Sequence, residues 1–155
     1  MKIVHVVPAL TKGGGEKVAA ELANHAARDG HQVTLISGWP VDSSLLRDAL
    51  DPEVGVFYVS KSKVSQIWRY FNLTSWLWRH RVWLVDQDIL HCHLTYAMIF
   101  GILVRLWRSI TRAEGPVIVQ TNHSVGAPIS RLRRGLFWRM AAQLDAQALI
   151  AEDEY

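Results

Sequence analysis

Short apolar runs alternate with longer amphipathic segments along the whole chain of 155 residues. Short runs rich in β-branched residues are typical of buried strands. A regular succession of strands and helices is typical of a parallel sheet that is covered on both faces. The pattern therefore predicts a Rossmann-like α/β fold, a three-layer αβα sandwich with a parallel sheet of about six strands. The predicted strands are Lys2–Val7, Gln32–Ser37, Val56–Val59, Ile89–His93, Val117–Thr121 and Ala148–Ala151.

The segments between these strands have helical periodicity. The predicted helices are Gly15–Arg28, Val64–Val85, Tyr96–Thr111 and Ser130–Leu144. The first of them is expected to stop at Gly30 in a left-handed C-cap. Open α/β sheets bind ligands outside the carboxyl ends of their strands, so functional residues are expected in the loops that follow the strands.

The helix predicted over Val64–Val85 combines an apolar stripe with several tryptophans and arginines. We expect the stripe to pack onto the sheet, as in an ordinary amphipathic helix. Tryptophan beside arginine is typical of a membrane interface, and five such residues lie off the stripe, Trp76, Trp83, Arg69, Arg79 and Arg81. The membrane-interface candidates among them are Trp76, Arg79 and Trp83. The residues of the stripe are Val64, Ile67, Trp68, Phe71, Trp78 and Val82.

The net charge is only +3, but the basic residues are clustered. No acidic residue occurs between Glu53 and Asp86, and a second basic cluster covers 131–139. Such clusters indicate a surface that faces phosphate, acidic glycan or anionic lipid, or a solvated face without a partner. No recognised nucleic-acid-binding motif accompanies them, so no nucleic acid partner is expected. The basic residues of the first cluster are Lys61, Lys63, Arg69, Arg79 and Arg81.

Other compositional features indicate a cytoplasmic protein. Cys92 is the only cysteine, so no disulfide can form within the chain, as suits a reducing compartment. The first residues lack the features of a signal peptide, and no apolar run is long enough to span a bilayer. We expect a cytoplasmic protein that binds peripherally to the anionic inner face of the cytoplasmic membrane.

Three consecutive glycines, Gly13, Gly14 and Gly15, stand between the first strand and the first helix, followed by Glu16. Without Cβ atoms they allow close approach of a ligand, and the helix start offers N–H groups to an anion. The alternative is a flexible turn in which Glu16 stabilises the first helical turn. The segment lacks the ending of a Walker loop, and Val18 replaces the third glycine of the dinucleotide fingerprint, which disfavours NAD.

The histidines form a second group of candidates. His91 and His93 alternate on a predicted strand and share one face, whereas His5, inside the first strand, is expected in the core. His123 follows the fifth predicted strand, at the edge where ligands gather. A metal-dependent hydrolase using His91, His93 and His123 is one alternative function. No metal cofactor is expected, however, because no acidic residue stands near His93 or His123 in the sequence and Cys92 points to the other face.

Several segments, taken in order, resemble the N-terminal domain of retaining glycosyltransferases of family four, which have the GT-B fold. The likeness covers nearly the whole chain. The first segments are Lys2–Pro8, Gly13–Val18 and Gly30–Ile36, and the later ones are the Asp-hydrophobic-hydrophobic-His-x-His segment Asp88–His93, then Val117–Ser124 and Ala148–Ala151.

The resemblance implies that Gly13 and Gly14, with Gly15 beside them, lie against the donor diphosphate or sugar. It implies that His123 is the catalytic residue at the transferred sugar, and that Asn122 and Ser124 bind the acceptor. The donor is then a nucleotide-sugar co-substrate, and the acceptor is a glycan, a lipid-linked glycan or another hydroxyl compound.

The same resemblance makes residues 1–155 the acceptor-side half of the enzyme. The family's donor-nucleotide domain, with its paired glutamates, would be a C-terminal domain that this chain lacks. We therefore expect the isolated chain to be inactive. A non-catalytic module that binds anionic glycan or membrane is the remaining alternative.

Overall fold

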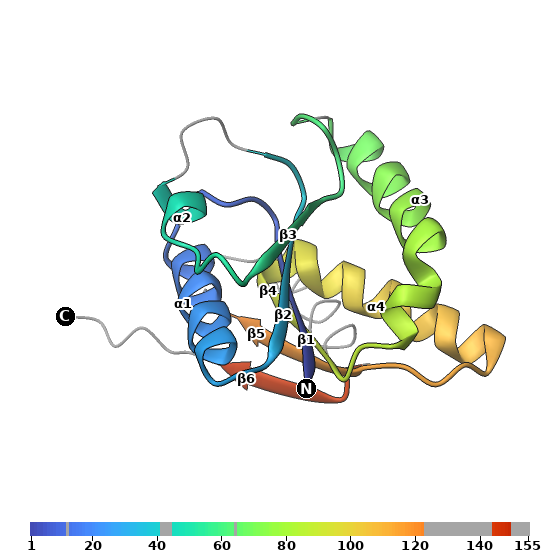
Figure 1. The fold of residues 1–155 in the computed structure, drawn as a ribbon. Coiled ribbons are helices and arrows are strands. Elements are labelled where there is room, and N and C mark those ends of the chain that lie inside the picture. The colour runs from blue at the N-terminus through green and yellow to red at the C-terminus, as the bar shows by residue number, and fades with distance from the viewer. Residues whose placement is uncertain (12, 41–44, 64, 123–143, 150–155) are drawn as a thin grey trace.

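Six parallel strands form one sheet in the order β3-β2-β1-β4-β5-β6 (Figure 1). The computed structural model describes residues 1–11, 13–40, 45–63, 65–122 and 144–149. The parallel, Rossmann-like sheet expected from the sequence is confirmed. The strands are β1 (Lys2–Val7), β2 (Gln32–Ser37), β3 (Gly55–Tyr58), β4 (Ile89–His93), β5 (Val117–Asn122) and β6 (Ala146–Leu149).

Helices cover both faces of the sheet. In Figure 1, α1 lies on one side of the sheet, and α3 and α4 lie on the other. This arrangement gives the three layers of an αβα sandwich. The helices are α1 (Gly14–Arg28), the short α2 (Leu45–Asp48), α3 (Gln66–Val85) and α4 (Leu94–Thr111).

Each face of the sheet has its own hydrophobic core. Under α1 the strands contribute Val33 and Leu35, and the helix contributes only small side chains such as Ala23. Under α3 and α4 the core holds Val6 and Leu90 with larger side chains. Side chains alternate between the two faces along each strand, so odd- and even-numbered residues pack against different helices.

The strand order reverses between β1 and β4. The chain runs outward from β1 through β2 to β3, and then returns to β4, which pairs with β1 on its other side. The register sets His5 against His91 and Val6 against Cys92. The loops that leave β1 and β4 therefore diverge to opposite faces, and such a point is where open α/β sheets bind ligands.

Most predicted boundaries agree with the structure. Three strands have the predicted limits, whereas β3 begins one residue early and β6 two residues early. The first helix ends as expected, with Gly30 at φ +79 and its N–H donating to the carbonyl of Ala27. Residues 130–143 of the predicted fourth helix lie outside the described residues. The sequence did not predict α2, which has four residues.

The orientation predicted for α3 is wrong. Val64 lies outside the described residues, and the other residues expected to pack onto the sheet are exposed, Ile67 at 82%, Val82 at 76%, and also Trp68, Phe71 and Trp78. Trp76, an expected surface residue, is only 6% exposed and lies in the core between α3 and α4. Trp83 packs partly buried against the same core, whereas Arg79 is exposed as expected.

Candidate functional site at the carboxyl edge of the sheet

The glycine turn lies at the carboxyl end of β1, at the point where the strand order reverses. Gly13 is the N-cap residue of α1 in an extended conformation, and no side chain caps the helix start. The N–H groups of the first turn of α1 therefore have no side-chain acceptor at this cap, and an anion could accept from them.

Two glycines of this turn differ in the space around them. A Cβ on Gly13 would collide with the carboxylate of Glu16, which itself accepts a hydrogen bond of 3.2 Å from Thr11. A Cβ on Gly14 would meet nothing within 4 Å. Gly15 is buried at the start of α1. Space for a ligand thus exists beside Gly14, while Gly13 and Glu16 shape the turn.

The backbone at the end of β4 is strained at one residue. Leu94 has a φ of +68, in the left-handed region that non-glycine residues rarely adopt. It directly follows His93 and begins α4, and the Gln120 side chain reaches its carbonyl at 3.4 Å. Such strain persists where the surrounding structure fixes it, often at a functional site. No pattern in the sequence indicated it.

Aromatic and basic side chains gather where β2 ends. Gly38 lets this end close onto the loop after β1, because its N–H donates to the Pro8 carbonyl at 2.9 Å and a Cβ there would collide with that carbonyl. The guanidinium of Arg69 lies 5.1 Å from the ring centroid of Trp39. Burial raises the pKa of Tyr96, and the nearby charge of Arg69 opposes that rise. The sequence pattern did not predict this group, although Trp39 closely follows the end of a predicted strand, where ligand-binding residues are expected.

Three histidines converge lower on the sheet, on the face that α1 covers. Nδ1 of His5 lies 3.1 Å from Nε2 of His93, and Nε2 of His91 lies 2.7 Å from the hydroxyl of Thr121. Burial, and then the neighbouring His91, lower the pKa of His5 to about 3. His91 and His93 share a face as predicted, and buried Cys92 points to the opposite core, where burial raises its pKa to about 12.

The remaining predicted site residues follow β5. Asn122 is the last residue of that strand and pairs in register with Leu149 of β6, so its backbone stands at the carboxyl edge. His123 and Ser124 lie outside the described residues. The structure therefore brings the glycine turn, the end of β4 and the end of β5 to one edge of the sheet.

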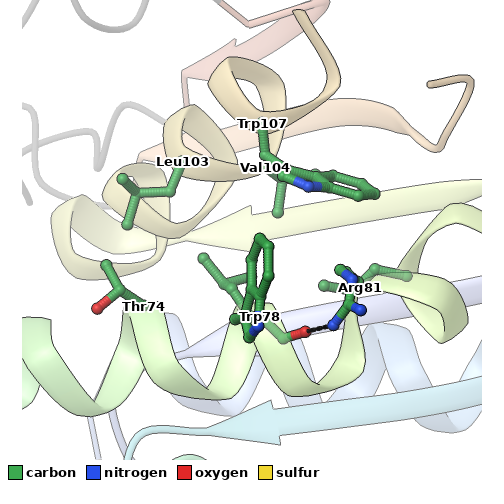
Figure 2. A pocket seen from close by; sticks show the side chains of 8 residues that line it. Thr74, Trp78, Arg81, Leu103, Val104 and Trp107 are labelled. Carbon is green, nitrogen blue, oxygen red and sulfur yellow. Dashed lines mark hydrogen bonds between the residues drawn. The ribbon is translucent and has the colours of Figure 1, made fainter. Parts of the chain in front are cut away.

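The second surface feature is a groove. A groove of about 140 Å³ runs between α3 and α4, with Trp78 and Arg81 on one wall and Leu103 and Trp107 on the other (Figure 2). The guanidinium of Arg81 lies 4.5 Å from the ring centroid of Trp78. No helix among the described residues is long and apolar enough to cross a membrane.

Residues 12–155 match the family model of Glycosyltransferase Family 4. The fold is also similar to two solved structures, each with a TM-score of 0.61 and each matched by 99% of this chain. One is the Anabaena protein Alr3699/HepE in complex with UDP, at 16% identity, and the other is Acinetobacter baumannii MurG, at 12% identity. The chain spans 38% and 42% of their lengths, respectively. A comparison with curated proteins gives no match.

Proposed function

The chain belongs to Glycosyltransferase Family 4, and we propose that it forms the acceptor-side half of an enzyme that transfers a sugar from a nucleotide-sugar to a hydroxyl acceptor with retention. The observation that carries this proposal is the glycine turn at the point where the strand order reverses, beside the uncapped start of α1. The Anabaena neighbour was solved with UDP, which supports a nucleotide partner.

Sugar transfer needs stabilisation of the negative charge that develops on the leaving diphosphate. Gly14 and the first N–H groups of α1 suit this role, because the space beside Gly14 is open and the helix dipole favours an anion. His123 contacts the transferred sugar, and Asn122 and Ser124 bind the acceptor. Arg69 adds a cation at the same edge, which suits an acidic glycan.

The opposing wall of the cleft belongs to a C-terminal domain that carries the nucleotide. Donor and acceptor must be held in line for transfer, and one half of the fold holds only one of them. The chain of 155 residues alone therefore transfers no sugar. Sugar transfer by this chain alone would contradict the proposal.

The donor site is tested in the full-length enzyme with a panel of nucleotide-sugars. Gly14→Ala places a methyl group in open space, so the variant should fold, yet the methyl would obstruct a diphosphate. We expect kcat/KM to fall by at least about tenfold. The matched control is Gly55→Ala at the amino end of β3, where a Cβ makes only ordinary contacts and activity should be unchanged. Equal activity of both variants would place the donor elsewhere.

The catalytic residue and the stereochemistry are tested separately. His123→Ala should lower kcat more than it raises KM, because the proposed contact is with the reacting sugar. NMR of the product should show the anomeric configuration of the donor. An inverted product would rule out the retaining mechanism.

The outer face of α3 suggests a further partner, the anionic inner face of the cytoplasmic membrane. Contiguous exposed apolar patches mark interaction sites. Here large apolar side chains share one helix face, and Trp68 and Phe71 pack edge to face with ring centroids 5.6 Å apart. We define the outer α3 face as Ile67, Trp68, Phe71, Trp78 and Val82.

Charge favours a membrane over another protein surface as the occupant. Lys61, Lys63 and Arg79 are exposed, and no acidic residue occurs between Glu53 and Asp86. Basic residues near an anionic bilayer contribute about 1 kcal/mol each, and tryptophans sit well at headgroup depth. Trp76, which the sequence assigned to this surface, is buried and has no part in it.

Sedimentation with liposomes of anionic and of neutral lipid tests this partner. The Trp68→Ser/Phe71→Ser variant should bind anionic liposomes at least about tenfold more weakly, because each large side chain buried contributes about 1.5–3 kcal/mol. The matched control is Leu22→Ser on α1, which is 41% exposed. Self-association without lipid that the double variant abolishes would instead assign the outer α3 face to a second copy of the chain.

A further inference from the structure

Three imidazoles meet on one face of the sheet because of strand register alone. His5 on β1 is the direct partner of His91 on β4, and His93 lies two residues further along β4 on the same face. The ring centroids of His91 and His93 are 4.1 Å apart, and that of His5 is 5.2 Å and 5.4 Å from them. Each ring belongs to a central strand, so the cluster stands on a rigid part of the fold.

The nitrogen positions suit a small cation. One ring nitrogen from each histidine lies within 4.8 Å of the other two. Nδ1 of His5 and Nε2 of His93 are 3.1 Å apart. Two nitrogens bound tetrahedrally to zinc at 2.0–2.1 Å lie about 3.3 Å apart, so small ring rotations would bring all three into range.

His5 provides an independent observation. This residue is 2% exposed, and its Nε2 has no hydrogen-bond partner among the described residues. An unpaired buried polar group costs about 1–3 kcal/mol. An ion bound at Nε2 of His5 would supply the missing partner, and the 3.1 Å contact between Nδ1 of His5 and Nε2 of His93 would then remain a hydrogen bond.

We infer that His5, His91 and His93 form a binding site for a divalent transition-metal ion of the zinc class. Imidazole nitrogen suits zinc, copper, nickel and iron, whereas magnesium and calcium prefer oxygen ligands. Three protein ligands leave one tetrahedral position for water or an anion. The sequence predicted no metal and named His123 as the third histidine of an alternative site; the β1–β4 register supplies His5 instead.

The surroundings fit a stabilising role for the ion. The Thr121 hydroxyl bonds Nε2 of His91, and metal-bound histidines usually have such a partner on the other ring nitrogen. Through Thr121 the ion would connect β5 to β1 and β4, just below the point where the strand order reverses. The inference does not depend on sugar transfer, and its test needs no substrate.

Metal binding is measured on the chain as it stands. The protein is stripped with EDTA and titrated calorimetrically with zinc, and the bound metal is counted by elemental analysis after dialysis. We expect one zinc ion per chain, thermal stabilisation by zinc but not by magnesium, and affinity at least about tenfold lower in His91→Gln and in His5→Gln. The matched control is His25→Gln, an exposed residue of α1 whose ring bonds the Glu21 carbonyl.

Cobalt titration of the unmutated chain keeps the test independent of variant folding. Absorption bands of tetrahedral cobalt with nitrogen ligands would support the site. Less than one ion per chain, an equal loss of affinity in His25→Gln, or equal stabilisation by magnesium would each overturn the inference.

Discussion

Helices α1 and α3 cover opposite faces of the same sheet, but they bury their residues in different ways. α1 has one buried face made of small residues, Gly15, Ala19, Ala20, Ala23 and Ala27. α3 has large apolar residues on both its faces, and only one of these can meet the sheet. The hydrophobic periodicity of a helix determines its orientation on the sheet when only one face is apolar. When both faces are apolar, either of them could be the buried one.

The aromatic cluster around Trp76 explains which face of α3 is buried. The ring of Trp76 stacks on His80 with centroids 4.0 Å apart, and it packs edge to face on Trp83 at 6.4 Å. It also contacts Phe100 of α4, with centroids 5.9 Å apart. The opposite face holds Trp68 and Phe71, whose rings pack edge to face and are exposed. Contacts with α4 and the sheet therefore favour burial of the Trp76 side.

The largest expected effect tests this orientation directly. Trp76→Ala should lower the free energy of unfolding by about 3–5 kcal/mol, because it empties a buried aromatic site. Urea denaturation measures the change.

The matched variant for this test is Trp68→Ala on the outer α3 face. Trp68 is 59% exposed, so its loss should change stability by no more than about 0.5 kcal/mol. If both variants cost the same, α3 is rotated relative to the orientation described above.

The pH dependence of stability reports on the α1 side of the sheet, because the buried imidazoles lie on that side. The pKa of His5 is lowered from 6.5 to about 3, so the unfolded chain binds the proton first as the pH falls. Stability is unaffected by this group above pH 6.5 and is lost below it, by about 1.4 kcal/mol for each pH unit until the folded-state pKa is reached.

Unfolding of the EDTA-treated chain between pH 6.5 and 4.5 measures this loss, to which His5 is expected to contribute about 2 kcal/mol. The free energy of unfolding lost between pH 6.5 and 4.5 should be smaller by that amount in His5→Leu and unchanged in His25→Gln. Carboxylates contribute equally in all three proteins, so the difference isolates His5. Identical pH profiles would show that His5 is not buried as a neutral ring.

The packing of α1 can be tested in the opposite direction, by adding volume. Ala23 is fully buried against the sheet, and Ala23→Leu should cost about 1–3 kcal/mol through overpacking. Ala26, partly buried beside that core, provides the comparison, since Ala26→Leu has more room. A neutral Ala23→Leu would mean that the α1 interface is loosely packed.

The sequence predicted the strands well because runs rich in β-branched residues, such as Ile3–Val7, are short and buried. It placed the glycine turn and the end of β5 at one edge because parallel strands end together. It could not predict that His5 pairs with His91, since they lie 86 positions apart in the sequence and only the strand order brings them together. The strained Leu94 and the orientation of α3 also depend on tertiary packing, which a local pattern does not contain.

The smallest predicted effect concerns how the two helices end. α1 ends before Gly30 at φ +79, whereas α3 ends at Asp86 with φ −81. A Cβ on Gly30 would meet nothing within 4 Å, so Gly30→Ala should cost only the backbone strain, about 1 kcal/mol. Asp29→Ala, at the preceding residue with φ −78, should stay within about 0.5 kcal/mol. Urea denaturation distinguishes the two, and a neutral Gly30→Ala would mean that α1 ends without a left-handed residue.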